Sequence, residues 1–213
     1  ALVAAVLRPI WQAKPETAER VKQRMHGVMG WGWAHGYCPS NPVDVVHHLL
    51  PKIESKATRV QHQPAMPWRD IPAFVSSTLY PYQEGECTRP LLTFLILTAC
   101  RSGEARGATW AEIDLDAAVW TIGKERMKAD KEHRVPLSQE AIALLELIQE
   151  YTQPQDFIFP APRNGQMLSD MSLTTLIKRM HEQKVKENGI GYIDPKQNRV
   201  ITTHGFRSTF RDW

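Results

Sequence analysis

Apolar side chains recur every three or four residues over long stretches of this chain, which is the spacing of one face of an α-helix. At the N-terminal end the pattern predicts a short helix over 2–12 and a long one over 16–37. The long helix begins after Pro15 and ends at the proline-containing run 38–42, because proline fits the first turn of a helix but not its interior. We predict that residues 1–55 are the C-terminal part of a helical domain whose beginning precedes the chain.

A polar stretch without apolar periodicity comes next. Residues 54–67 contain Pro64 and Pro67 among lysine, arginine, glutamine and histidine side chains. Such a composition is typical of a segment between domains. We therefore expect a linker at 56–67 and a second domain at 68–213.

The second domain is predicted to be mainly α with a small antiparallel β-sheet, an α+β fold. Two short β-prone runs surround a charged segment, which indicates a hairpin with a long, exposed and basic tip. We expect helices over 68–80, 89–100 and 102–109, followed by hairpin strands at 119–122 and 133–137. A helix should then run from its N-cap Ser138 to about 151, with an extended piece at 157–160 and a turn at 164–165 after it. The rest of the chain is expected to form a helix that Ser169 or Asp170 caps and that reaches about 186, a loop over 188–199, and a final helix that Thr202 or Thr203 caps and His204 begins.

The composition fits a soluble globular protein of 213 residues, 42% of them apolar and 23% charged. The longest apolar run, over 91–100, is shorter than the roughly 20 residues of a membrane-spanning helix, so no membrane partner is expected. Cys38, Cys87 and Cys100 are odd in number and widely spaced, which argues against a disulfide framework or a cysteine-based zinc site and fits the reducing cytoplasm. We assign no metal and no cofactor.

The net charge of +3 is modest, but the charges are unevenly distributed. Residues 1–62 and 178–213 each hold eight lysines and arginines against four acidic residues, whereas residues 63–177 hold ten against fifteen. The basic ends suit a surface that faces a polyanion such as DNA. They suit solvated helix faces equally well, so charge alone does not separate the two interpretations.

Three clusters carry candidate chemistry, and the first surrounds Arg101. This arginine lies where one apolar helix is predicted to end and another to begin. Such a junction can direct a guanidinium out of a buried platform, where it binds two oxygens of a phosphate. The alternative, which is commoner for a single arginine, is a side chain that caps helix carbonyls and pairs with Glu104 three residues later.

The second cluster is the charged hairpin tip, where Lys128 lies between Lys124 and Lys131. An ammonium group beside a phosphodiester can protonate the departing oxygen, the general-acid step that strand cleavage without a metal requires. A solubilising surface charge is the other interpretation of each lysine, and Lys124 and Lys131 are alternatives to Lys128 in the role.

The third cluster is His204 and Arg207 at the start of the last predicted helix. At positions i and i+3 the two side chains share a helix face, and the free amides of a helix N-terminus favour an anion there. An ordinary surface pair is the alternative. The hypothesis that joins the clusters is that Arg101, Lys128, His204 and Arg207 converge on one DNA phosphate.

Together the clusters resemble, in order, spacing and local sequence, the catalytic domain of the tyrosine site-specific recombinases, especially the integrases of phages and genomic islands. Residues 95–113 resemble the family's first arginine motif, and 120–138 resemble its β-hairpin. The run Thr-His-Gly-Phe-Arg-Ser-Thr at 203–209 resembles its second histidine-arginine motif. Upstream, 18–42 is similar to the end of the family's helical core-binding domain, and only 182–200 is longer than usual.

The resemblance implies a role for each candidate residue. Arg101 and Arg207 would clamp the scissile phosphate and offset the negative charge of the transition state, with Glu104 in its usual supporting place. Lys128 would be the general acid for the 5′ oxygen, and His204 would assist proton transfer to or from the nucleophile. A tyrosine would form a 3′-phosphotyrosine link that conserves the bond energy for rejoining, with no metal or cofactor.

The resemblance also implies partners and a location. The partner would be double-stranded DNA with att-like sites, bound by a homotetramer of the full-length protein at the nucleoid in the cytoplasm. Residues 1–55 would be part of the DNA-binding core-binding domain, and 68–213 would be a catalytic domain truncated at its C-terminus.

The sequence departs from the family pattern at the nucleophile, which in the family follows the histidine-arginine motif. All tyrosines of this chain precede His204; they are Tyr37, Tyr80, Tyr82, Tyr151 and Tyr192. Trp213 follows Arg207 too closely to match the family's later histidine or tryptophan. We therefore expect a fragment that holds DNA without cutting it.

Two other functions fit the same residues. One is a type IB topoisomerase, whose constellation is similar, and the other is a DNA-binding or regulatory module with an inactive site. The integrase-like context of Arg101 and Lys128 favours site-specific recombination, that is, integration or excision of a phage or genomic island by the full-length protein.

Overall fold

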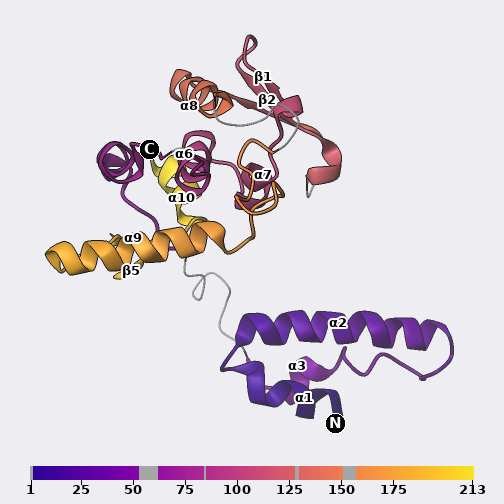
Figure 1. Cartoon of the computed structure of the whole chain (residues 1–213). Coiled ribbons are helices and arrows are strands. Elements are labelled where there is room, and N and C mark those ends of the chain that lie inside the picture. The colour runs from indigo at the N-terminus through magenta and orange to yellow at the C-terminus, as the bar shows by residue number, and fades with distance from the viewer. Residues whose placement is uncertain (1, 53–61, 84, 128–129, 151–156) are drawn as a thin grey trace. The chain divides into compact units, whose positions relative to one another are not determined.

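The protein is described by a computed structural model that covers residues 2–52, 62–83, 85–127, 130–150 and 157–213 (Figure 1). Its internal contacts divide the chain into two compact units, Ala1–Gln61 and His62–Trp213. Each unit has a hydrophobic core of its own.

The first unit is helical. Its described helices are α1 (Leu2–Trp11), α2 (Pro15–Ala34) and α3 (Val46–Leu49). Leu7 of α1 and Val46 of α3 are completely buried, and the indole N–H of Trp11 donates to the Pro51 carbonyl at 2.7 Å. Apolar burial and this hydrogen bond hold the end of the unit against α1.

Both helices predicted for this unit are confirmed. α2 ends at Ala34, before the predicted end at residue 37, and Gly36 follows with a φ of +75° that favours glycine. The short helix α3 was not predicted, because four residues are too few to show a helical period.

In the second unit, α6 (Thr88–Thr98) is the central helix. Its residues 90–96 are all buried, so it is apolar on every side rather than amphipathic. It packs against α7 (Ser102–Arg106), α8 (Gln139–Gln149), α9 (Ser172–Asn188) and α10 (Gly205–Asp212), which surround it in Figure 1. Residues far apart in the sequence are brought together on this one helix.

The helix predicted over 68–80 is confirmed but irregular. It consists of a 3₁₀ turn η1 (Trp68–Asp70), a short helix α5 (Ile71–Phe74) and a π-helical turn η2 (Val75–Leu79). The 3₁₀ turn η3 (Trp110–Glu112) then leads from α7 into the sheet.

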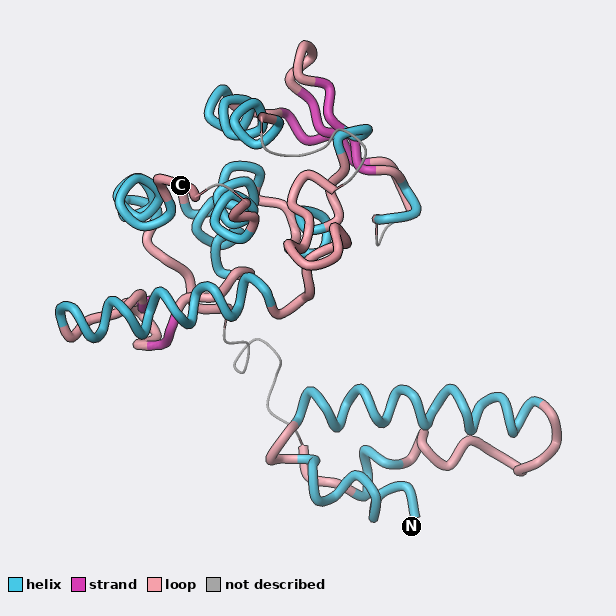
Figure 2. Tube along the Cα trace, viewed as in Figure 1, coloured by secondary structure: helices cyan, strands magenta, loops and turns pink. Residues whose placement is uncertain are grey.

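The predicted hairpin is confirmed as part of a three-stranded antiparallel sheet of order β1-β2-β3 (Figure 2). Its strands are β1 (Ile113–Asp114), β2 (Val119–Ile122) and β3 (His133–Pro136). Trp120 pairs with Val135 and, on its other side, with Ile113. Trp120 and Ile122 are completely buried, as the period of two along a strand requires.

Of the predicted caps, Ser138 is confirmed, whereas the other two predictions are wrong, because the N-cap of α10 is His204 and that of α9 is Met171. The Ser138 hydroxyl accepts from the Ala141 amide at 3.3 Å, and the Thr202 hydroxyl accepts from the Gly205 amide at 3.0 Å. No side chain caps α9, because the Ser169 hydroxyl bonds to the Ser172 hydroxyl instead.

The loop predicted over 188–199 is also wrong in part. Strands β4 (Ile193–Asp194) and β5 (Arg199–Val200) pair antiparallel within it. Each strand has two residues, which is too short to show an alternating pattern in the sequence.

Residues 62–67, here named the strap, pack on the second unit. The Asp194 carboxylate accepts from the Ala65 amide at 3.0 Å, and the Pro64 carbonyl accepts from the Thr202 amide at 3.0 Å. Met66 is buried in the core, and its carbonyl accepts from the Thr209 hydroxyl at 2.7 Å. The sequence predicts a linker up to residue 67, whereas these contacts make the strap part of the fold; residues 53–61 lie outside the described part.

We expect Asp194→Ala to release the strap and to lower the free energy of unfolding by about 2 kcal/mol, since hydrogen bonds to a charged acceptor are worth roughly 1.5–3 kcal/mol. The protection factor of the Ala65 amide in hydrogen exchange measures the release locally. An unchanged protection factor in this variant would contradict the assignment.

The same contact makes the strap sensitive to acid. Burial alone would raise the pKa of Asp194, but hydrogen bonds from the amides of Ala65, Lys196 and Gln197 outweigh it and lower the pKa. The stabilisation is therefore complete above the pKa of the unfolded state, about 4, and is lost as the pH falls through the lower pKa of the folded state. In the control Asp194→Asn, protection should not vary in that range.

Candidate phosphate-binding site

The junction between α6 and α7 positions the first candidate arginine. α6 ends at Thr98, and Ala99 takes the left-handed conformation with φ 48° and ψ 25°, which turns the chain at the helix C-terminus. Arg101 is then extended and is the N-cap of α7. A left-handed alanine costs about 1–2 kcal/mol, so contacts around the junction must hold this turn.

Glu104, in the first turn of α7, binds Arg101 twice. One carboxylate oxygen accepts from the Arg101 amide at 2.8 Å and the other accepts from its Nη1 at 2.6 Å. The Glu104 side chain is 7% exposed, whereas that of Arg101 is 52% exposed. The buried carboxylate therefore fixes the guanidinium and leaves much of it open to a ligand. The sequence offered the pairing of Arg101 with Glu104 as an alternative to phosphate binding, but the two are compatible.

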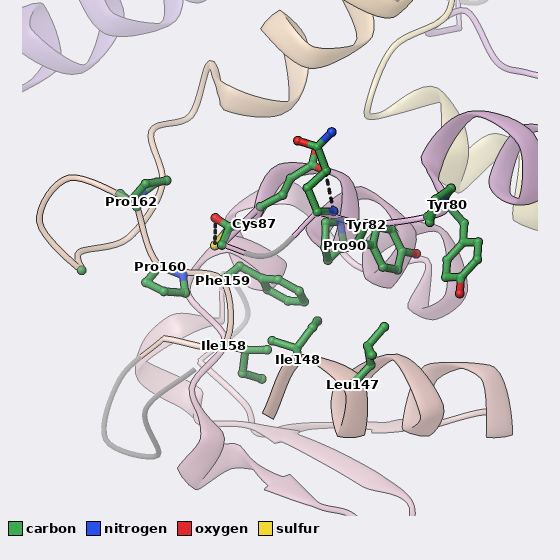
Figure 3. Close-up of a pocket in the computed structure, with 16 residues that line it drawn as sticks. Tyr80, Tyr82, Cys87, Pro90, Leu147, Ile148, Ile158, Phe159, Pro160 and Pro162 are labelled. Carbon is green, nitrogen blue, oxygen red and sulfur yellow. Dashed lines mark hydrogen bonds between the residues drawn. The ribbon is translucent and has the colours of Figure 1, made fainter. Parts of the chain in front are cut away.

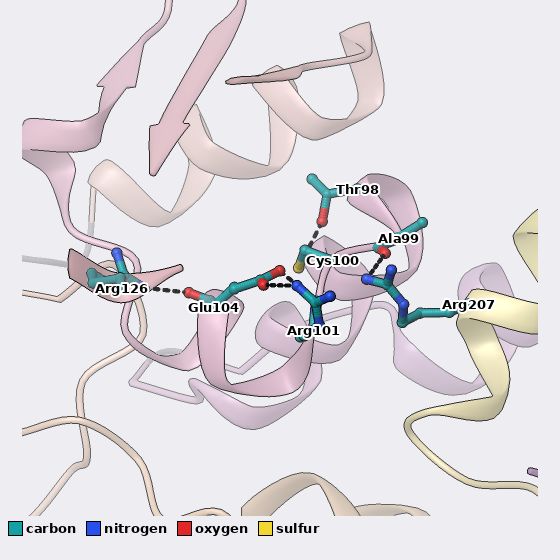
Figure 4. A network of polar contacts seen from close by, with 7 residues as sticks. All are labelled: Thr98, Ala99, Cys100, Arg101, Glu104, Arg126 and Arg207. Atoms are coloured by element: carbon teal, nitrogen blue, oxygen red, sulfur yellow. Dashed lines mark hydrogen bonds and ion pairs between the residues drawn. The ribbon is translucent and has the colours of Figure 1, made fainter. Parts of the chain in front are cut away.

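Arg207 reaches the same junction from α10. Its Nη1 donates to the Ala99 carbonyl at 2.7 Å, across 108 residues of sequence, and Figure 4 shows Arg101 and Arg207 beside each other there. The start of α10 is fixed by its approach to the strap, because a β-carbon on Gly205 would collide with the Pro64 carbonyl oxygen. The fold thus brings Arg101, Glu104 and Arg207 together.

Of the two remaining candidates, only His204 lies within the described residues. His204 is the N-cap of α10, one turn before Arg207 on the same helix, and its side chain is exposed. No hydrogen bond within the described residues joins its imidazole to Arg101. Lys128 lies outside the described residues; its neighbour Met127 follows the 3₁₀ turn η4 (Lys124–Arg126) and packs on the core.

Two further charged residues belong to the network and were not predicted. Arg126 donates from Nη2 to the Glu104 carbonyl at 2.6 Å and from Nη1 to the Glu112 carboxylate. Glu112 also accepts from the indole N–H of Trp120 at 3.0 Å. In the sequence Arg126 is one of several charges on a hairpin tip, and nothing in that pattern separates a surface charge from one that binds a main-chain carbonyl.

Cys100 directly precedes Arg101 in the chain and is 4% exposed. The pKa of its thiol is raised to about 12, mainly by burial; the Thr98 hydroxyl and Arg207 act to lower the pKa, and the Glu104 charge acts to raise it. The hydroxyl donates to Sγ at 3.1 Å. Cys100 is therefore a neutral, buried group at the junction and adds no negative charge.

The arrangement is suited to an anion with several oxygens. In the described part of the chain the Glu104 carboxylate pairs with Arg101 alone, and Arg207 binds an uncharged main-chain carbonyl, so the two guanidinium groups leave an excess of positive charge at the junction. Their planar N–H donors match phosphate geometry. Within the described residues no three histidine, cysteine or acidic side chains are grouped as metal ligands, and none of the described helices is long and apolar enough to cross a membrane.

A separate pocket of about 480 Å³ lies between the segment that runs from Tyr80 into the start of α6, the end of α8 and residues 158–165 (Figure 3). Its walls are mainly apolar and aromatic, with Tyr82, Pro90, Ile148 and Phe159 among them. None of the described residues that line it is an arginine or lysine, so the pocket is not suited to a phosphate.

Comparison with known sequences gives a consistent result along the chain. Residues 73–213 match the sequence model of the phage integrase family, and residues 1–48 match that of the phage integrase central domain. The integrase of Enterobacteria phage P4 is 28% identical over 223 residues, which cover 99% of this chain and 46% of that protein. The chain thus spans slightly less than half the length of this relative.

Solved structures share the fold. The Tn1549 transposon integrase in complex with circular intermediate DNA matches with a TM-score of 0.70 and 13% identity, over 98% of this chain and 69% of that one. A lambda integrase tetramer bound to a Holliday junction matches with a TM-score of 0.62 and 15% identity, over 97% and 56%. The predicted fold class, mainly α with a small antiparallel sheet, is confirmed.

We expect Cys100 to resist alkylation in the folded chain. With a pKa of about 12, only about one thiol in ten thousand is a thiolate at pH 8, and the sulfur is covered by packing. Iodoacetamide labelling followed by peptide mass spectrometry should show modification of Cys100 only in denaturant, while the half-buried Cys38 serves as the internal control. Labelling of Cys100 at the same rate with and without denaturant would show that the junction is not packed in this way.

Proposed function

The chain belongs to the phage integrase family, and on that premise we propose that it is the phosphate-binding part of a tyrosine site-specific recombinase. The observation that carries the proposal is the meeting of Arg101 and Arg207 at the α6–α7 junction, where Glu104 and the Ala99 carbonyl hold them. Their proposed ligand is the scissile phosphate of DNA. Positive charge at this point offsets the negative charge that grows on the phosphate oxygens in the transition state.

The proposed reaction is a transfer of the phosphate between two oxygens. A tyrosine hydroxyl attacks the phosphorus, the bond to the 5′ oxygen breaks, and a 3′-phosphotyrosine forms. Lys128 gives a proton to the 5′ oxygen, and His204 takes the proton of the tyrosine. The five tyrosines of the chain precede His204, so the nucleophile is assigned to a residue outside this chain.

We propose double-stranded DNA as the partner and the nucleoid as the location. The similar structures support the DNA partner, since the Tn1549 integrase is bound to circular intermediate DNA and the lambda integrase tetramer to a Holliday junction. By the same argument the intact protein acts as a homotetramer on att-like sites. Residues 1–55 are proposed to contact DNA as part of the core-binding domain, and 68–213 as the catalytic domain.

We expect the intact gene product that contains this chain to form a covalent adduct with a nicked DNA duplex, detected on a denaturing gel. Arg101→Ala and Arg207→Ala should each reduce the rate of adduct formation by roughly 10²–10³, the usual effect of removing one preorganised transition-state donor. An adduct that forms equally well in both variants would refute the assignment. No adduct in the unmodified protein would favour the module that binds DNA without cutting it.

We expect this chain alone to bind duplex DNA in a strongly salt-dependent way, because its contacts are mainly to phosphates. Affinity should fall by about 100-fold or more between 50 and 200 mM salt, and Arg101→Ala should reduce the slope of log K against log salt by about 1. Fluorescence anisotropy over a salt series measures both quantities. Binding that does not change with salt would contradict a phosphate-contacting surface.

A further inference from the structure

Arg126 lies between the helix that carries Glu104 and the edge of the sheet. Its Nη2 donates to the Glu104 carbonyl at 2.6 Å, and its Nη1 donates to Glu112. The side chain is 24% exposed, and both Nη atoms are engaged inside the protein. These contacts direct the guanidinium toward α7 rather than toward solvent.

The approach of Arg126 to α7 depends on the absence of a side chain at Gly107. This residue is the C-cap of α7, and a β-carbon on it would lie 2.8 Å from Nη2 of Arg126 and 3.3 Å from its Cζ. The guanidinium therefore lies directly on the C-terminal end of the helix, where unpaired carbonyls and the helix dipole favour a positive charge.

Glu112, the second acceptor of Arg126, is itself held by a residue of the sheet. Glu112 is 15% exposed, and its second carboxylate oxygen accepts from the Trp120 indole at 3.0 Å and from the Thr109 amide at 3.3 Å. Trp120 is completely buried in β2. Glu112 is thus a fixed partner for Arg126. Since Arg126 also binds the Glu104 carbonyl, it ties the position of α7 to that of Glu112.

α7 has five residues, which is too short for a helix to keep its place without tertiary contacts. Glu104 is bound on both sides: Arg126 holds its carbonyl, and its carboxylate holds Arg101 (Figure 4). We propose that Arg126 is a positioning residue, which sets the orientation of the Arg101 guanidinium through Glu104. This inference rests on the proposed function, because the orientation of Arg101 matters only if its guanidinium binds a DNA phosphate.

The test compares three variants of this chain. Arg126→Ala removes the contact, and Gly107→Ala displaces the guanidinium while it keeps the charge. Arg106→Ala is the matched control, because Arg106 is on the same helix and also donates to a main-chain carbonyl, that of Leu168 at 2.6 Å, without touching Glu104. Arg126→Lys, which reaches only one of the two acceptors, replaces Arg126→Ala should that variant fail to fold.

The first readout needs no DNA. NMR relaxation of the Arg101 side-chain Nε–H reports how firmly Glu104 holds the guanidinium. Arg126→Ala and Gly107→Ala should lower its order parameter, and Arg106→Ala should leave it unchanged. An unchanged order parameter in both variants, or an equal decrease in the control, would overturn the proposal.

The second readout is a double-mutant cycle on DNA affinity. Arg126→Ala should weaken binding about threefold or more in the unmodified chain and should have no effect in the Arg101→Ala background, since coupled residues are not additive. An additive loss would mean that Arg126 contacts DNA itself and would overturn the positioning role. Equal DNA affinity of Arg101→Ala and the unmodified chain would count against the proposed function, and the NMR result would still decide the link between Arg126 and Arg101.

Discussion

Burial of a carboxylate costs free energy unless its charge is paired and its oxygens accept hydrogen bonds, and Glu104 meets both conditions only when Arg101 is beside it. The pairing fixes the start of α7 and the direction of one arginine at the same time. Because the Arg101 side chain is about half exposed, the interaction orients the guanidinium and still leaves part of it accessible to a ligand. The rest of the site is arranged around this pair.

The other arginine is brought to the pair by packing of the whole unit. α6 is buried along its central part and presents its C-terminal turn to α10, where Arg207 binds the carbonyl of Ala99. The strap fixes α10 in turn, since Thr209 binds the Met66 carbonyl and Gly205 leaves room for Pro64. A site built from distant parts of the chain therefore depends on contacts that stabilise the fold.

The parts that could be predicted from the sequence are those with a strong local signal. Periodicity predicts α2 and α6, the β-prone runs predict the hairpin, and the order of the motifs points to Arg101 and Arg207. The strap and the β4–β5 pair could not be predicted, because the strap is held by bonds to residues more than 125 positions away and each strand has two residues. Arg126 was missed for a related reason: a bond to a main-chain carbonyl leaves no pattern in the sequence.

The central claim is that Arg101 and Arg207 act on the same phosphate. A crystal structure of this chain bound to duplex DNA tests it most directly. The account predicts that N–H groups of both guanidiniums lie about 2.7–3.2 Å from non-bridging oxygens of one phosphate, with the bond between Arg101 and Glu104 intact. Arginines bound to two different phosphates, or Arg207 turned away from the DNA, would contradict it.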